Sequence, residues 1–403
     1  QGNNILAIHA LNATVDEDRF LICPELCLEA EQQEPDPDNP DCVKTNWGTE
    51  FWLAFPENYE EEPGAPINLS LCIVGSRGTT GSVSIPGMAV LGFPQTFTIG
   101  QARKVSIPIP SSVELKGKDK LESKGIRVVA NKLVSVYGQN HQDYSTDGYL
   151  GLPLDCLGTE YVVMTYKNVQ SSLPLLQGSQ FAVVAPYNDT TVTITPKNTI
   201  GSYTAGVPFD VLLQKGETYQ LRNEADAPGD VAGTCIVSDK PVGVFGSHRC
   251  ANIQSPTQWF CDTLVEQLLP EAAWGSNYRI APLATRGGDL IRITALKDNT
   301  SVGIYNPTLT NVILDRGEIH EFTMTTPASI GADGKISVAQ FSQSSDYDGV
   351  VDADPFMTLI QPRKSWLKGY SVCTPPATEF PQSYATVIAD STSDLGVITL
   401  NGT

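Results

Sequence analysis

The sequence lacks the features by which several classes of protein are recognised. No apolar run approaches the ~18 residues that a membrane span requires. The chain has 26 Lys and Arg against 45 Asp and Glu, a net charge of −19. Because nucleic acids and anionic membrane surfaces attract clustered cations, we expect no nucleic-acid partner and no membrane insertion.

Signs of catalysis are also scarce. The motifs GxSxG and HExxH and the phosphate-binding P-loop are absent, and the chain has four histidines. A nucleophilic triad needs a histidine oriented by an acid. His141 lies near Asp143, but nothing marks a serine as its partner, so we predict a protein that is not an enzyme.

Cysteine, by contrast, is plentiful, with nine residues that do not form the paired CxxC spacing of a zinc site. Disulfides in an oxidising compartment are the better interpretation. We predict a disulfide between Cys250 and Cys261. His248 with these two cysteines and Asp262 could instead be drawn as a zinc site, but cysteines in an oxidising space pair with one another.

The chain also contains five N-x-S/T sequons, which favour a secreted glycoprotein. Asn188 and Asn299 fall in matching turns of two repeats. The candidate glycosylation sites are Asn12, Asn68, Asn188, Asn299 and Asn401.

The apolar residues occur in short runs rich in Val, Ile, Thr, Tyr and Phe, and these runs recur as a repeat. Copies open at Gly48 (GTEFWLAFP), Gly158 (GTEYVVMTY), Gly275 (GSNYRIAPL) and Gly369 (GYSVCTPPA). The openers lie roughly 90–120 residues apart, which suits a small β domain better than a solenoid turn. The aromatic residue close behind each opener is expected in the core.

Alternation of apolar and polar residues, as in TVTIT at 191–195, predicts strands separated by turns. We predict an all-β fold of tandem antiparallel β-sandwich-like repeats, with a large-bladed β-propeller as the alternative. One helix is expected at 262–269, where four apolar residues have helical spacing. The predicted divisions are an acidic, Cys- and Pro-rich segment and linker at 1–46, repeats at 47–157, 158–274 and 275–366, and a partial repeat at 367–403.

The N-terminal segment contains ILAIHALNATV, a candidate strand at about residues 4–15. Such a strand could pair back onto its own repeats or join the sheet of a neighbouring molecule, giving a homo-oligomer. Self-pairing and disorder remain the alternatives.

Long connections follow each of the three repeats, and such loops are the usual place for function in a β scaffold. The third holds four aspartates that could bind a structural calcium ion, namely Asp346, Asp348, Asp352 and Asp354. A solvated acidic loop tip is the alternative. In the second loop, Trp259 and Phe260 are candidate partner contacts, with packing on the base of the loop as the alternative.

Several of these residues carry a family resemblance. GTEY at 158–161, the KPV strand that ends in GS at 246–247, the C-x10-C-D-x2-V-E-Q-L-x-P run at 250–270 and the WGSNY that follows resemble the IgGFc-binding domain family, named after the N-terminal domain of IgG Fc-binding protein. The resemblance covers about residues 46–403. It implies a secreted, mucus- or surface-associated, non-catalytic protein, and it transfers no Fc-contact residues.

The sequence as a whole predicts a secreted, extracellular binding or adhesion protein that contacts protein or glycoprotein partners through its inter-repeat loops. The alternative is a structural subunit of an extracellular filament or matrix assembled by β-strand exchange. Apart from the candidate calcium ion, no cofactor is expected.

Overall fold

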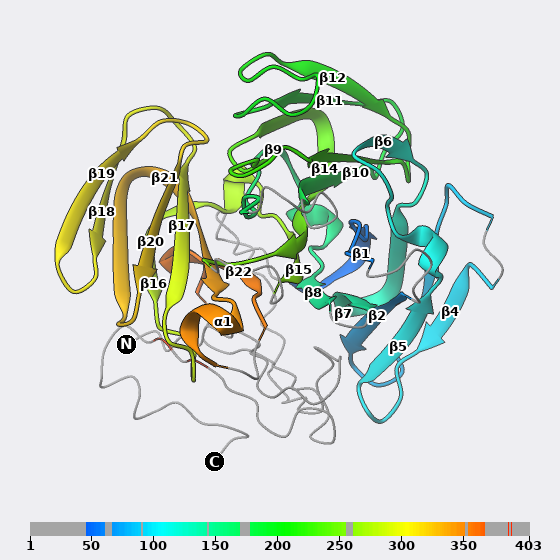
Figure 1. The fold of residues 1–403 in the computed structure, drawn as a ribbon. Coiled ribbons are helices and arrows are strands. Elements are labelled where there is room, and N and C mark those ends of the chain that lie inside the picture. The colour runs from blue at the N-terminus through cyan, green and yellow to red at the C-terminus, as the bar shows by residue number, and fades with distance from the viewer. Residues whose placement is uncertain are drawn as a thin grey trace, which may run out of the picture.

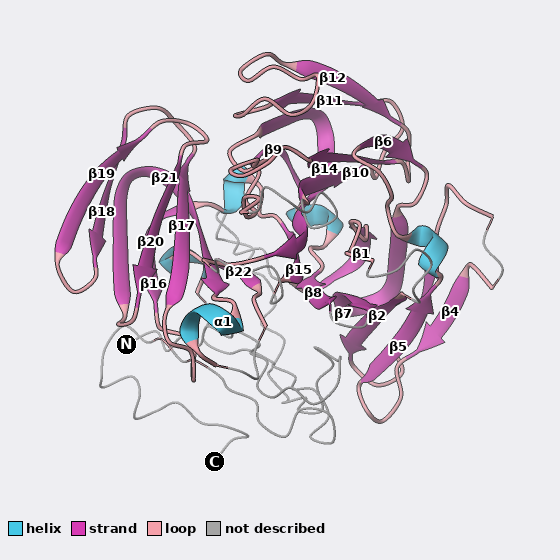
Figure 2. Cartoon of the chain, viewed as in Figure 1, coloured by secondary structure: helices cyan, strands magenta, loops and turns pink. Residues whose placement is uncertain are grey.

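Figure 1 shows the computed structural model of the chain. It describes residues 46–60, 67–89, 92–142, 145–169, 178–254, 261–350 and 354–366, with Thr386 and Ile388. The candidate N-terminal strand and nearly all of the fourth repeat therefore lie outside the described residues. Strands dominate the described chain (Figure 2), and their pairing separates them into three sheets.

The first sheet has seven strands in the order β4-β3-β7-β2-β5, with β1 and β8 also paired to β7. Its strands are β1 (Gly48–Leu53), β2 (Asn68–Gly75), β3 (Thr80–Ser84), β4 (Gln95–Thr98), β5 (Lys104–Ile109), β7 (Ile126–Gln142) and β8 (Ser145–Leu150).

The second sheet has eight strands in the order β12-β11-β14-β10-β13-β6, with β9 and β15 also paired to β14. Its own strands are β9 (Gly158–Val162), β10 (Ser179–Val184), β11 (Thr190–Thr195), β12 (Phe209–Leu213), β13 (Thr218–Asn223), β14 (Cys235–Ala251) and β15 (Asp262–Gln267). The eighth strand, β6 (Asp119–Glu122), comes from the first repeat and pairs antiparallel with β13. One repeat thus supplies an edge strand to the next.

The third sheet has seven strands in the order β19-β18-β21-β17-β20, with β16 and β22 also paired to β21. Its strands are β16 (Gly275–Ile280), β17 (Asp289–Ala295), β18 (Thr300–Tyr305), β19 (Leu309–Leu314), β20 (Ile319–Met324), β21 (Ala328–Ser342) and β22 (Met357–Ile360). Helices are limited to α1 (Ser345–Asp348) and the 3-10 turns η1 (Ser111–Val113), η2 (Leu154–Cys156), η3 (Glu271–Ala273) and η4 (Arg363–Ser365) within the described residues.

One long strand organises each sheet: β7, β14 or β21. The first half of β14 pairs with β9 and β11, and its second half pairs with β10 and β15. The strand therefore passes through both layers of its repeat and encloses a core between them. The prediction of tandem antiparallel β repeats is confirmed.

Neighbouring repeats also share their cores. The core of the first sheet includes Ala182, Val184, Phe245 and Val265 from the second. The core of the second likewise includes residues of the third, among them Leu290 and Phe341. Figure 1 shows the three sheets side by side, with β8, β15 and β22 toward the middle.

The opener glycines have a packing role that recurs in each repeat. A Cβ on Gly48 would lie 2.4 Å from Pro153, one on Gly158 2.5 Å from Pro270, and one on Gly275 2.4 Å from Pro362. Any other residue would clash, so the backbone of each opener strand fits only as glycine against the proline before a 3-10 turn.

The aromatic residues behind the openers lie in the core, as the repeat pattern predicts. Phe51 and Tyr161 are fully buried, and Tyr278 is 1% exposed. The Tyr161 hydroxyl accepts a hydrogen bond from the Gly158 N–H and donates one to Val242 O, and Tyr278 does the same with Gly275 and Ile336.

The prediction of a helix at 262–269 is wrong, because this segment forms strand β15. Leu264 and Val265 are adjacent and point to opposite faces of the strand, yet both are buried. Leu264 packs in the core of the second sheet and Val265 in that of the first. A strand between two cores is apolar on both faces, and over a short segment this pattern resembles a helical one.

Candidate functional site

The segments that follow the three long strands lie side by side. The Ile253 N–H donates to Ser344 Oγ at 3.0 Å, and the Ser344 N–H donates to Ile253 O at 3.1 Å. On the other side of the second segment, the Thr146 N–H donates to Asp262 Oδ1 at 2.8 Å. We call residues 145–147, 252–254, 261–263 and 343–348 the loop cluster.

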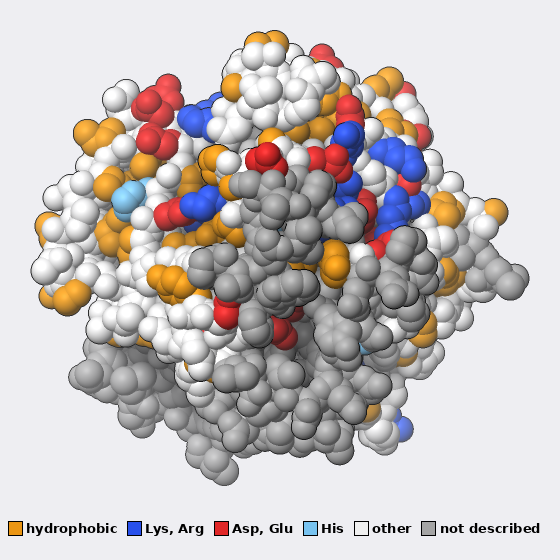
Figure 3. All heavy atoms as spheres, in the orientation of Figure 1, with side chains coloured by type: hydrophobic (Ala, Val, Ile, Leu, Met, Phe, Trp, Pro, Cys, Tyr) orange, Lys and Arg blue, Asp and Glu red, His pale blue; other side chains and the backbone are white. Residues whose placement is uncertain are grey.

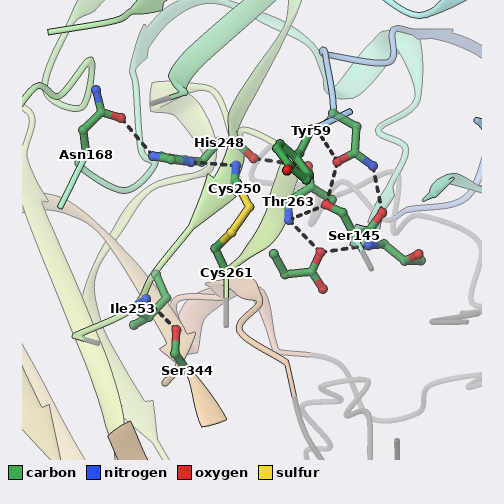
Figure 4. Close-up of a disulfide and its surroundings, with 12 residues drawn as sticks. Tyr59, Ser145, Asn168, His248, Cys250, Ile253, Cys261, Thr263 and Ser344 are labelled. Atoms are coloured by element: carbon green, nitrogen blue, oxygen red, sulfur yellow. Dashed lines mark hydrogen bonds between the residues drawn. A yellow bond between two sulfur atoms is a disulfide. The ribbon is translucent and has the colours of Figure 1, made fainter. Parts of the chain in front are cut away.

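A disulfide closes the middle segment of the loop cluster (Figure 4). It joins Cys250, near the end of β14, to Cys261, just before β15, with 5.0 Å between the two Cα atoms. The two stems of this loop are therefore held together at its base. Trp259 and Phe260 lie in the same loop but outside the described residues, so their partner role stays a prediction.

His248 lies next to the disulfide and is fully engaged. Its Nδ1 accepts a hydrogen bond from the Cys250 N–H at 3.0 Å, and its Nε2 lies 3.1 Å from Asn168 Oδ1. Since Oδ1 can only accept, the proton is on Nε2. Burial, then the positive charge of nearby arginines, lowers the pKa of His248 to about 3, so the ring is neutral. It is a structural residue and does not complete a zinc site with the paired cysteines.

Asn168 holds His248 in place, and the sequence alone did not indicate this role. Its Oδ1 also accepts hydrogen bonds from the Gly178 and Ser179 N–H groups, and its Nδ2 donates to two backbone carbonyls. Asn58 is its counterpart in the first repeat, where Nδ2 donates to Asn140 Oδ1 and to Ser145 O. Each asparagine lies ten residues after its opener glycine, a signal that superposing the repeats would have shown.

Two buried carboxyl groups connect the first and second repeats through reciprocal hydrogen bonds. Asp147 in β8 accepts from the Val265 N–H at 2.8 Å, while Asp262 in β15 accepts from the Thr146 N–H. Burial raises the pKa of both well above the ordinary value, and for Asp262 the carboxylates of Asp354 and Asp147 add to the effect. These side-chain hydrogen bonds join β8 to β15 in place of main-chain pairing between the two strands.

A buried arginine connects the second and third repeats. Arg292 is 2% exposed, its Nη2 lies 2.9 Å from Asp230 Oδ2, and its Nε donates to Glu321 Oε1 at 2.8 Å. Its guanidinium also lies over the ring of Tyr166, 5.0 Å from the centroid. Glu321 is shared with Lys167, 2.7 Å away. These contacts fix the orientation of the two repeats that carry the second and third loop segments.

The junction between the first and second repeats has a comparable network of ion pairs, but there the first of the two repeats contributes a carboxylate and the second contributes the arginines. Glu57 pairs with Arg222 at 2.7 Å and with Arg249 at 3.2 Å. Glu57 and Lys167 each lie nine residues after an opener glycine, yet they carry opposite charges and meet opposite partners. The position is therefore a junction contact in both repeats, although its residue type differs.

The described residues of the aspartate loop do not support the predicted calcium site. Asp348 Oδ2 lies 2.8 Å from Arg286 Nε, and both side chains are almost completely buried. Asp354 contributes its backbone carbonyl to Ser342 Oγ, Asp346 lies in α1, and Asp352 is outside the described residues. No group of three or more His, Cys, Asp or Glu suited to a metal ion occurs in the described part of the chain. Calcium is not supported, because the cation beside Asp348 is already an arginine.

Comparison of the sequence with known proteins identifies a family. Residues 147–403 match the family model described as IgGFc binding protein. The chain belongs to the IgGFc-binding protein family. The IgGFc-binding protein of Homo sapiens is 26% identical over 367 residues, which cover 89% of this chain and 6% of that relative. The chain spans a small part of that protein's length, and the family resemblance read from the sequence is confirmed.

The loop cluster of this family member also displays an aromatic residue that the sequence did not single out. Tyr347, in α1, is 48% exposed, whereas its neighbours Ser344 and Ser345 are buried. An exposed aromatic side chain on a fixed base is typical of a contact residue. None of the helices in the described ranges is long and apolar enough to span a bilayer.

Three of the five sequon asparagines are described, and all three are exposed: Asn68, Asn188 and Asn299. The turns that hold Asn188 and Asn299 correspond, because Thr190 and Thr300 each donate to the carbonyl three residues earlier. With these threonines aligned, the two asparagines occupy adjacent positions of the turn. Asn12 and Asn401 lie outside the described residues, and glycosylation at all five stays a prediction.

Proposed function

We propose that this chain is a secreted, non-catalytic binding or adhesion module whose loop cluster contacts a protein or glycoprotein partner. The human relative is named an IgGFc-binding protein, which supports a protein partner. The disulfide and the exposed sequon asparagines suit the oxidising secretory route. Calcium has no part in this proposal.

The observation that carries the proposal is the convergence of segments from three repeats on one fixed base, the first of these segments being the start of β8. Reciprocal hydrogen bonds join Ile253 to Ser344, and Asp262 joins the same segment to the first repeat. A rigid base lowers the ordering cost of binding, because the loops need not be immobilised when the partner arrives. Tyr347 then supplies exposed aromatic area, and Trp259 and Phe260 are placed next to Cys261 in the sequence.

The chemistry of the site supports binding over catalysis. His248 is the histidine nearest the disulfide, and both of its ring nitrogens have hydrogen-bond partners. The Asp147 and Asp262 carboxyl groups accept backbone N–H groups from the opposite strand. Side chains committed in this way position the loops and are not available to transfer protons to a substrate.

Human IgG Fc, native and enzymatically deglycosylated, is the first probe. We expect Tyr347→Ala and the double variant Trp259→Ala/Phe260→Ala each to weaken binding at least about fivefold, as loss of a buried aromatic anchor does. Tyr187→Ala is the matched control, since Tyr187 is 41% exposed and lies outside the loop cluster. Equal binding by the deglycosylated Fc would indicate that protein surface is recognised.

A Cys250→Ser/Cys261→Ser variant is expected to weaken binding as well, because the loop loses its closed base. Fc binding that survives all three loop variants would refute the loop cluster as the contact. A chain that binds neither Fc nor a purified secreted mucin would refute the proposed function itself.

The alternative is a structural subunit that assembles by strand exchange. Strand β6 of the first repeat pairs with β13 of the second. This pairing favours assembly by strand exchange, because the sheet edge at β13 accepts a strand from outside its own repeat. The candidate strand at residues 4–15 would do the same to a neighbouring molecule. The mass of the chain in solution, with and without residues 1–45, separates this alternative from other modes of association.

A further inference from the structure

The outer edge of the third sheet is an open strand of unusual regularity. β19 pairs with β18 through six successive residues without a bulge, from Thr300 opposite Leu314 to Tyr305 opposite Leu309. Within the described residues its other side has no strand partner, because β19 is the last strand of the sheet order. Figure 1 places this strand at the outer left margin of the molecule.

Its exposed face carries large apolar side chains on either side of Asn311 and no charge. Leu309 is 64% exposed, Ile313 is 69% exposed, and Tyr305 on the neighbouring strand is 55% exposed. Figure 3 shows hydrophobic side chains on this margin. The strand reads Leu-Thr-Asn-Val-Ile-Leu, so it lacks the Lys, Pro and bulges with which natural proteins block open edges.

The corresponding edges of the other two sheets differ. β12 carries Asp210 beside the exposed Leu212, and that aspartate accepts a hydrogen bond from Thr193. β4 exposes Thr96 and Thr98. An apolar, uncharged and regular edge therefore distinguishes the third sheet from the first two.

We propose that β19 pairs antiparallel with β19 of a second copy of this chain, about a two-fold axis at Asn311. The outward positions alternate along the strand as Leu309, Asn311 and Ile313. In this register Leu309 lies opposite Ile313 of the second copy, and Asn311 lies opposite itself. The strand therefore matches an antiparallel copy of itself, as an isologous interface requires.

The chemistry of the edge favours a second copy as the occupant. Two molecules of net charge −19 repel each other, so self-association needs a contact surface without charge, and β19 supplies one. The contact is main-chain pairing plus apolar cross-strand pairs, so added salt should strengthen it by screening the repulsion. This inference concerns a surface outside the loop cluster, and it stands or falls independently of the proposed function.

Cysteine cross-linking tests the register directly. In antiparallel pairs, residues directly opposite have Cα atoms about 4.5–5.5 Å apart, within disulfide range. Asn311→Cys should therefore form a covalent dimer under mild oxidation, well beyond any formed by the wild-type chain. Ile313→Cys is the control, because its counterpart in the second copy would lie four residues along the strand, about 13 Å away. Equal cross-linking of both variants, or of neither, would overturn the proposed register.

Mass in solution tests the association itself. By sedimentation velocity, the full chain should approach twice 43.4 kDa as concentration and salt rise. Ile313→Lys should abolish the shift, while Leu212→Lys, on the matching strand of the second sheet, should preserve it. Deletion of residues 1–45 should also preserve it. Loss of the dimer on that deletion would assign assembly to the N-terminal strand instead, and a wild-type chain that remains monomeric at all concentrations would overturn the proposal.

Discussion

Arg292 shows how single buried side chains hold the repeats together. It is almost completely buried, yet its charge is matched by Asp230 and Glu321, and its remaining nitrogen donates to the Thr165 carbonyl. Burial of an unpaired charge is costly, so the arginine and its carboxylate partners stabilise one another. The surface pair of Arg316 and Glu160 has similar geometry, but both side chains are about one-third exposed.

The two arginines should therefore differ sharply on substitution. Arg292→Met leaves Asp230 without its cation and Glu321 with Lys167 alone, and we expect it to lower the free energy of unfolding by about 3–5 kcal/mol. Arg316→Met should cost less than about 1 kcal/mol, because water screens that pair. Urea unfolding of both variants checks this, and equal midpoints would show that the buried network does not stabilise the junction.

At the scale of elements, β15 shows both what the sequence reveals and where it misleads. The β pattern and the repeat period were readable because most strands have one buried face and one exposed face. β15 lies between two cores, so its apolar residues do not alternate and were mistaken for a helix. Its fixed position comes from Asp262 and from Asp147 of β8, whose hydrogen bonds span 116 and 118 residues of sequence. Local patterns carry no information about such contacts.

The carboxyl pair between β8 and β15 should make stability depend on pH. Because the folded pKa of Asp262 lies above its unfolded value, the folded state holds the proton more tightly. Its contribution is greatest at acidic pH and declines as pH rises from about 4, the unfolded pKa, toward the folded pKa. Ionisation of Asp262 should accordingly lower the melting temperature of the wild-type chain as pH rises from 4 to 8.

Asp262→Asn isolates this contribution, since the amide oxygen can still accept from Thr146 while the side chain cannot ionise. We expect the variant to melt above the wild type at pH 8 and to show a shallower slope with pH. Each unit of pKa difference corresponds to about 1.4 kcal/mol. Asp333→Asn, at an exposed aspartate that accepts from the Ser301 N–H, is the control and should retain the wild-type slope. Identical slopes for all three proteins would refute the assignment.

At the scale of the whole molecule, the decisive feature is the meeting of three loop segments that are distant in sequence. Repeat symmetry predicted loops in comparable places, but not that Ile253 would bond to Ser344. Their meeting depends on junction contacts whose residue types are not repeated, as Glu57 and Lys167 show. The sequence could therefore identify the disulfide and the loops, while the shared base and the exposed Tyr347 required the fold.

Hydrogen–deuterium exchange of the full chain, with and without saturating human IgG Fc, shows which surface contacts the partner. If the loop cluster is the contact surface, amides of residues 252–263 and 343–350 should exchange more slowly in the complex, while those of β18 and β19 remain unchanged. Protection confined to the outer edges of the sheets, with the loop cluster exchanging at its free rate, would refute the loop cluster as the contact surface.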